Sequence, residues 1–185
     1  MNAWVLPQSI EIGGTSYAIN ADFRDILDIL SRMNNPEEEE STRVYVALSL
    51  FYEEFDTMPE ADWDEAMQRM HEFISIGEED DGQRRPKEID WEQDRLLIIS
   101  DINDVAGCEI RNLEFCHWWT FMAWFNAIGE GQLSMVVSIR NKLRKHKKLE
   151  GWEREYYRLN RSKVDFKTKY TSAENETLSK WLGAK

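Results

Sequence analysis

Apolar positions along the chain repeat mainly with helical spacing, but a short stretch near the start alternates with a period of two. The alternating residues are Ile10, Ile12, Tyr17 and Ile19. Gly13 and Gly14 separate the two halves of this stretch, and a glycine pair there is typical of a tight hairpin turn. The pattern predicts one β-hairpin, which is too small to be stable alone and must pack on another element.

After the hairpin, apolar residues recur at spacings of three and four, which is the pattern of amphipathic helices. We expect helices near residues 23–33, 44–55, 63–74, 91–105 and 133–143. Short connections between the later helices favour antiparallel neighbours.

The stretch at about 110–128 is the most apolar part of the chain and contains three of its eight tryptophans. One apolar row runs along its helical period from Ile110 to Ile128, and Phe115, Trp118, Met122 and Phe125 form a second row. Apolar surface this wide predicts a helix that is buried on most sides. The predicted fold is therefore mainly α, a helical bundle around this central aromatic helix with a small N-terminal β-hairpin.

The chain has 185 residues, enough for one domain with its own core. We expect a single mainly helical domain over residues 1–170. The polar residues 78–88 predict a flexible acidic and basic loop inside it, and residues 171–185 predict a C-terminal tail with signals for one short helix.

Charge is divided unevenly along the chain, whose formal net charge is −12. Residues 1–90 carry 7 basic and 22 acidic groups, whereas residues 91–185 carry 16 basic and 13 acidic groups. This balance disfavours general binding to nucleic acid or to anionic membranes, although the C-terminal half could be a local exception.

Cysteine spacing and the absence of long apolar runs predict an intracellular protein. If Cys108 and Cys116 lie on one helix, they are about 12 Å apart, which is beyond disulfide reach. No apolar run is long enough to span a bilayer, and the first residues lack the pattern of a secretory signal.

Asp90 and Asp94 lie one helical turn apart, beside Glu92, and paired carboxylates can hold a divalent ion. The simpler interpretation is that they offset the positive end of a helix dipole, since no catalytic partner accompanies them.

Cys108, Cys116 and His117 lack the close ligand pairs of a structural zinc site. His117 is expected to be a core residue that hydrogen-bonds a backbone carbonyl or Asp94. Neither a phosphate-binding loop nor a nucleophile motif is present, so the sequence implies no catalytic residue, metal or cofactor.

Two further groups of residues predict contacts with other molecules. The segment from Arg140 to Lys169 has twelve basic and four acidic residues, and a basic contact surface is expected at Arg140, Lys142, Arg144, Lys145, Lys147 and Lys148. It could pair with acidic protein, including another copy of the chain, or with nucleic acid. Trp63, Met67, Met70 and Phe73 are either core or a groove for an amphipathic helical client.

Several blocks of the sequence resemble a known family. The sharpest are Ile89-Asp90-Trp91-Glu92-Gln93-Asp94 and His117-Trp118-Trp119-x-Phe121; weaker ones are the hairpin, Asp22-Phe23-Arg24, Leu50-Phe51-Tyr52 and Ile139-Arg140. From about Leu6 to about Lys167, the chain resembles the bacteriophage "gene product fifteen" family of long-tailed phages of Gram-positive bacteria.

Members of that family look like tail assembly chaperones, which coat the tape measure protein, recruit major tail protein and are absent from the finished virion. The resemblance implies this non-catalytic role here, in the host cytoplasm during assembly, with those two proteins as partners. It also implies that the following signature residues build the core: Asp90, Trp91, Asp94, His117, Trp118, Trp119, Phe121 and Arg140.

Two other functional classes remain open at the level of sequence. One is a virion component, such as a tail-completion or connector protein. The other is a phage protein that binds or processes nucleic acid, for which Asp90 and Asp94 would be the catalytic candidates.

Overall fold

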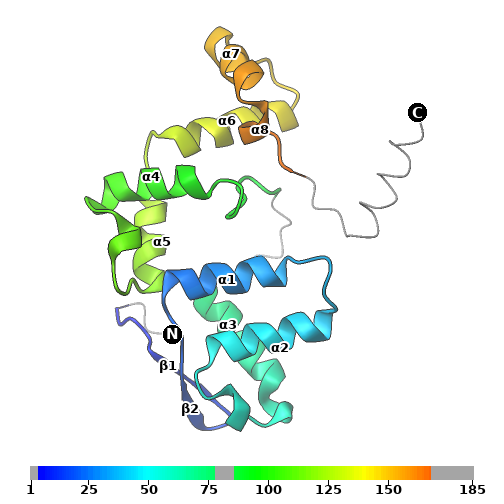
Figure 1. Ribbon diagram of the computed structural model, residues 1–185, viewed down its shortest axis with the longest axis vertical. Helices are drawn as coiled ribbons and strands as arrows, with labels where there is room; N and C mark the ends of the chain where they lie inside the picture. The colour runs from blue at the N-terminus through cyan, green and yellow to red at the C-terminus, as the bar shows by residue number, and fades with distance from the viewer. Residues whose placement is uncertain (1–3, 78–85, 168–185) are drawn as a thin grey trace, which may run out of the picture. The chain divides into compact units, whose positions relative to one another are not determined.

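The computed structural model describes residues 4–77 and 86–167. Within these residues the chain forms eight α-helices and one antiparallel β-hairpin, which confirms the predicted fold class (Figure 1). Residues 78–85 of the predicted loop and the predicted tail at 171–185 lie outside the described residues; residues 86–88 have no regular secondary structure.

Contacts within the chain divide it into two compact units. We call residues 8–20 and 24–71 the hairpin unit, and residues 4–7, 21–23 and the described part of 72–167 the aromatic unit. The single domain expected over residues 1–170 stays a prediction.

The hairpin unit begins with the predicted β-hairpin, formed by β1 (Ser9–Ile12) and β2 (Thr15–Ala18). Ile10 pairs with Tyr17 across the hairpin, and both side chains are buried. Gly13 and Gly14 have φ angles of 57° and 80°, which a two-residue turn of this hand requires and which glycine adopts without strain. The hairpin prediction is confirmed.

Three helices lie mostly in this unit: α1 (Phe23–Met33), α2 (Glu40–Phe51) and α3 (Trp63–Ile74), with short 3-10 turns at Phe55–Thr57 and Glu60–Asp62. Phe23 and the end of α3, residues 72–74, belong to the aromatic unit. The second helix ends before the predicted residue 55, because Tyr52 becomes extended and pairs with Ile19 beyond β2. The Tyr52 hydroxyl is buried and donates a hydrogen bond to the Ala66 carbonyl on α3. This ring therefore connects the hairpin to two helices.

The aromatic unit contains α4 (Arg95–Ala106), α5 (Trp118–Asn126), α6 (Gln132–Arg144), α7 (Gly151–Leu159) and α8 (Arg161–Val164), with a 3-10 turn at Ile110–Asn112. Helix α4 contacts α5 and α6, and α8 contacts α6 and α7 (Figure 1). Ile139, Leu149 and Val164 form a buried cluster between α6 and α8. Tyr156 and Tyr157 of α7 pack against it, so the cluster holds the last three helices together.

The aromatic helix is shorter than the 110–128 that the sequence predicts. Helix α5 begins at Trp118. Ile110–Asn112 form a separate 3-10 turn, and residues 113–117 are not helical, because the backbone around His117 pairs with another segment. Phe23 N–H donates to the Cys116 carbonyl, and Trp118 N–H donates to the Ala21 carbonyl. As a result Phe115, predicted to be buried on that helix, is 57% exposed. Cys108 and Cys116 also lie on separate segments rather than on one helix.

The start of α6 depends on a glycine at position 131. A Cβ added there would lie 2.5 Å from Asp101 Oδ2, the oxygen that accepts the Leu133 N–H at the first turn of α6. We expect Gly131→Ala to lower the free energy of unfolding by about 1–3 kcal/mol, because the buried Asp101 must move. Urea denaturation would measure the loss. Gly129→Ala is the matched control, since its Cβ would meet no atom within 4 Å; equal losses in both variants would contradict the prediction.

Candidate functional site

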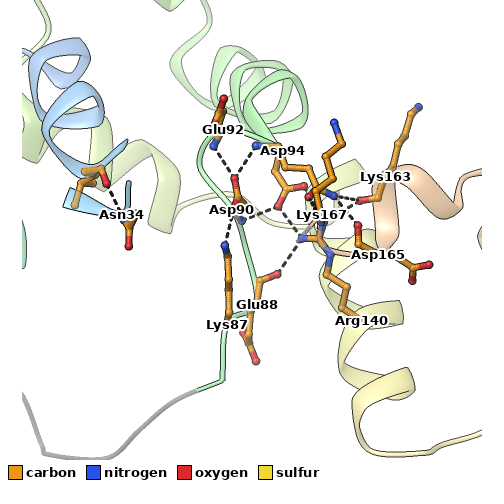
Figure 2. A network of polar contacts seen from close by, with 12 residues as sticks. Asn34, Lys87, Glu88, Asp90, Glu92, Asp94, Arg140, Lys163, Asp165 and Lys167 are labelled. Atoms are coloured by element: carbon orange, nitrogen blue, oxygen red, sulfur yellow. Dashed lines mark hydrogen bonds and ion pairs between the residues drawn. The ribbon is translucent and has the colours of Figure 1, made fainter. Parts of the chain in front are cut away.

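The strongest sequence signature, residues 89–94, forms a tight turn that leads into α4. Asp90 Oδ1 accepts hydrogen bonds from the Gln93 and Glu92 N–H groups at 2.7 and 3.0 Å. Lys87 Nζ donates to the other oxygen at 2.6 Å (Figure 2). Burial acts to raise the pKa of Asp90, but Lys87 and the two backbone donors outweigh it and hold the pKa below its ordinary value. Asp90 is thus an ionised residue that shapes the turn.

Asp94 is buried, 1% exposed, and forms a bidentate ion pair with Arg140 of α6. Arg140 Nη1 donates to Asp94 Oδ2 at 2.6 Å, and Nη2 donates to Oδ1 at 2.8 Å. The Asp90 N–H also donates to Asp94 Oδ2, at 2.9 Å. Both oxygens of this carboxylate are therefore occupied by donors from its own chain.

Arg140 uses each of its nitrogen atoms in this arrangement. Nε donates to the Val164 carbonyl at 2.7 Å, Nη1 also donates to the Glu88 carbonyl, and Nη2 also donates to the Lys163 carbonyl. With the two bonds to Asp94, these account for the five N–H donors of a guanidinium. The Phe166 ring covers the group at 4.1 Å from Cζ. Arg140 therefore ties α6 to the signature turn and to the end of α8.

Gln93 belongs to the same arrangement. We call it the Arg140 network: Asp90, Gln93, Asp94, Arg140 and their backbone partners. Asp90, Asp94 and Arg140 are labelled in Figure 2. The Gln93 side-chain N–H donates to the Asp165 carbonyl, and its side-chain carbonyl accepts from Lys167 N–H, both at 2.9 Å. The Gln93 side-chain amide thus makes one hydrogen bond as donor and one as acceptor with the backbone of residues 165–167. The contribution of residues 163–167 was missed from the sequence, because main-chain acceptors carry no residue-type signal.

The second signature block places His117 at the start of α5, as its N-cap. The His117 Nδ1 atom accepts the Trp119 N–H at 3.0 Å, so Nε2 carries the proton and donates to the Pro7 carbonyl at 3.0 Å. The partner is thus a backbone carbonyl, one of the two expected alternatives, while Asp94 is committed to Arg140. Both ring nitrogens of the buried His117 are engaged in holding the backbone.

The tryptophans of this block are buried with their indole N–H groups satisfied. Trp118 donates to the Ile74 carbonyl and Trp119 to the Phe73 carbonyl, each at 2.9 Å. Phe121 stacks on Trp118, with 5.5 Å between ring centroids. Trp91 of the first signature block meets both the Trp118 and the Phe121 ring, so the two blocks share one aromatic cluster.

The predicted contact residues divide between core and surface. Met70 and Phe73 are buried, whereas Trp63 and Met67 are half-buried, so only the latter two offer surface to a client. Arg140, assigned to the basic contact surface as well as to the core, is only 7% exposed. The surface prediction is wrong for this residue, because Arg140 is ion-paired with Asp94 and its N–H donors are all hydrogen-bonded inside the Arg140 network.

The remaining basic positions differ in their contacts. Lys142 is half-buried and bonds the buried Glu153 at 2.6 Å, an ion pair the sequence did not reveal. Arg144, Lys145, Lys147 and Lys148 are exposed.

The Lys142–Glu153 pair predicts an acid-sensitive contribution to stability. Lys142 and the Glu150 N–H hold the pKa of Glu153 below its ordinary value of 4.5. A carboxyl group with a lowered folded-state pKa stabilises the fold above its unfolded-state pKa and loses that contribution as the pH falls through the folded-state value. We expect Glu153→Gln to lower the free energy of unfolding by about 1–2 kcal/mol at neutral pH, with the difference shrinking below pH 4.5.

Denaturation of both proteins across this pH range would measure that difference. The exposed Glu155 on the same helix provides the control Glu155→Gln, which should leave stability unchanged at every pH. A difference for Glu153→Gln that grows on acidification would contradict the assignment.

A hollow of about 350 Å³ adjoins the Arg140 network, lined in part by Leu143, Val164 and Phe166. Each of its three cations is already ion-paired, at distances from 2.6 to 3.8 Å. The pairs are Lys87 with Asp90, Arg140 with Asp94 and Arg144 with Glu88. The hollow therefore offers no unpaired charge for the phosphate group of a cofactor.

Among the described residues, no group of three or more His, Cys, Asp or Glu side chains is arranged to hold a metal ion. Asp90 and Asp94, the metal candidates from the sequence, are bound by Lys87 and Arg140 instead. The chemistry of this site is that of a structural clamp, with carboxylates and guanidinium held in fixed geometry.

Comparisons with known proteins identify a family for the chain. No helix in the described part of the chain is both long and apolar enough to cross a bilayer. No curated protein and no solved structure matches the sequence. The model of one family, described as Bacteriophage Gp15 protein, matches residues 4–166, which include both signature blocks and Arg140. The chain therefore belongs to the bacteriophage Gp15 protein family.

Proposed function

We propose that this protein is a tail assembly chaperone, a non-catalytic phage protein that binds the tape measure protein and helps to recruit major tail protein. Membership of a phage protein family over residues 4–166 supports a role in building the phage particle. We place its action in the host cytoplasm during assembly and expect it to be absent from the mature virion.

The observation that carries the proposal is that the polar signature residues are engaged in hydrogen bonds and ion pairs inside the protein. Asp90, Asp94 and Arg140 bond to one another and to backbone groups, and His117 caps a helix within the same unit. Groups committed to internal bonds are poorly suited to act as a base, a nucleophile or a metal ligand. A function that depends on the exposed surface fits this distribution better than a reaction does.

Surface charge supports a solubilising role. The hairpin unit carries 14 acidic and 4 basic residues. A tape measure protein forms long helices with exposed apolar stripes, which aggregate unless they are covered. A small acidic protein bound to such stripes would replace an apolar surface with a repelling one.

Co-expression with the tape measure protein tests the proposal directly. We expect the chaperone to move most of the tape measure protein into the soluble fraction and to be recovered with it. A tape measure protein that stays as insoluble as when expressed alone would overturn the proposal. Purified virions should lack the chain, and a stoichiometric amount in them would favour the tail-completion or connector alternative.

A substitution on α3 tests where the client binds. Met67 is half-buried on the predicted client side of α3. We expect Met67→Glu to reduce the amount of tape measure protein in the soluble fraction, because it places a charge against the client's apolar stripe. Leu96→Glu is the matched control, since Leu96 is 67% exposed on α4. Equal effects of the two variants would remove α3 from the client site.

A further inference from the structure

Five exposed cations lie on α7 and on the turn that connects α6 to α7, and none of them makes an ion pair within the described part of the chain. We call them the basic surface: Lys145, Lys147, Lys148, Arg154 and Arg158. Lys142 differs, because Glu153 already neutralises it. The basic surface therefore presents its whole charge to solvent.

The first part of this surface is held in place by the end of α6. His146 has a φ angle of 52°, and Lys147 N–H donates to the Lys142 carbonyl at 2.8 Å. This is the bonding pattern with which a left-handed residue closes a helix. Leu149 follows and is buried, so the lysines are displayed from a turn that is anchored at both ends.

The second part lies on α7, which also leaves apolar side chains uncovered. Trp152 is 54% exposed and Leu159 is 65% exposed, and residues seven apart lie on one side of a helix. Arg154 and Arg158, four apart, share another side of α7, about 130° around the helix axis from Trp152 and Leu159. Exposed tryptophan and arginine together are the residue types that contribute most energy to protein interfaces.

The hairpin unit carries the opposite charge in the connection between α2 and α3. We call four exposed carboxylates there the acidic surface: Glu53, Glu54, Asp56 and Glu60. None of them makes an ion pair within the described residues. The Tyr45 ring, 47% exposed, lies next to this segment and packs edge-on against Phe55. This surface thus combines negative charge with an exposed aromatic group, as the basic surface combines positive charge with Trp152.

We propose that the basic surface of one copy of this protein binds the acidic surface of a second copy. Every chain carries one basic and one acidic surface. Complementary charge steers their association and disfavours contact between surfaces of the same sign. Because the two surfaces differ, the contact is heterologous: one copy of a pair keeps its acidic surface available and the other keeps its basic surface, so each can bind a further copy.

The test uses the full-length purified protein without any client. Sedimentation velocity should show association that grows with protein concentration and weakens between about 0.05 M and about 0.5 M salt, as screening shortens the range of exposed charges. We expect the double variants Arg154→Glu with Arg158→Glu, and Glu53→Lys with Glu54→Lys, each to weaken self-association by about tenfold or more.

Mixing the two variants provides the decisive measurement. The first variant keeps a native acidic surface and the second keeps a native basic surface, so the mixture should regain association to within about threefold of the wild type. Circular dichroism should show that each variant is folded. Lys147→Glu with Lys148→Glu replaces the α7 variant if that helix is disturbed.

Matched controls reverse charge elsewhere. Arg95 and Asp104 are exposed on α4, and Arg95→Glu or Asp104→Lys should change association by less than about twofold. Arg154→Glu alone makes the same change of charge as Arg95→Glu, and it should have the larger effect.

Three results would overturn the proposal: a wild-type chain that stays monomeric, reversed variants that associate as the wild type does, or a mixture that fails to regain association. A monomeric chain that binds labelled DNA at near-physiological salt, and loses binding on reversal of Arg154 and Arg158, would assign the basic surface to nucleic acid instead. These measurements contain no tape measure protein, so their outcome is independent of the chaperone test.

Discussion

Replacing Arg140 by alanine is expected to lower the free energy of unfolding by about 3–5 kcal/mol, because it leaves the buried Asp94 carboxylate without its cation. It also removes the donor to the Val164 carbonyl and the flat group that covers Phe166. Thermal and urea denaturation would measure the loss. A domain with the usual marginal stability would be largely unfolded by such a change.

Three comparisons separate the ion pair from general effects of substitution. Arg140→Lys should recover little of the lost stability. A lysine ammonium cannot bind both oxygens of Asp94 and at the same time reach the carbonyls of Glu88, Lys163 and Val164. Arg140→Met combined with Asp94→Leu should be less destabilised than Arg140→Ala alone, because no charge is left buried. Arg154→Ala, at an exposed arginine, should cost less than about 0.5 kcal/mol. A loss below about 1 kcal/mol for Arg140→Ala would contradict the structure of the network.

Trp118→Ala is expected to cost about 3–5 kcal/mol, which is typical when a fully buried aromatic side chain is truncated. Trp118 is 1% exposed, stacks on Phe121 and donates its indole N–H to the Ile74 carbonyl. The variant leaves a cavity at the aromatic cluster and an unsatisfied carbonyl beside it. Denaturation monitored by circular dichroism would measure the change without relying on tryptophan fluorescence.

Trp152→Ala is the matched control, since that ring is 54% exposed and its removal should change stability by less than about 0.5 kcal/mol. The loss of stability for Trp118→Phe should lie between those of Trp118→Ala and Trp152→Ala, because phenylalanine keeps much of the packing and loses only the hydrogen bond and part of the ring. If Trp118→Ala and Trp152→Ala cost the same, the aromatic cluster is not the centre of the aromatic unit.

Local patterns determined the hairpin and the existence of the helices. The glycine pair at 13 and 14 supplies the positive φ angles of the turn, and the alternation of Ile10, Ile12 and Tyr17 places them in the core. Helical spacing of apolar residues located α1 and α3, because that spacing follows directly from the 3.6-residue turn. The two signature blocks also pointed to the region around Asp94 and Trp118, since their residue types are unusual at those spacings.

Only the tertiary structure decided which of those residues meet and where the aromatic helix begins. Residues 113–117 continue a helical apolar pattern, yet they are not helical, because Asp22 pairs with His117 across 95 positions of sequence. Arg140 looked like one of several cations on a basic segment, and its burial follows from Asp94, which lies 46 residues earlier. Periodicity reports the environment within a few turns of the chain, whereas backbone pairing and ion pairs between distant segments depend on how the whole chain packs.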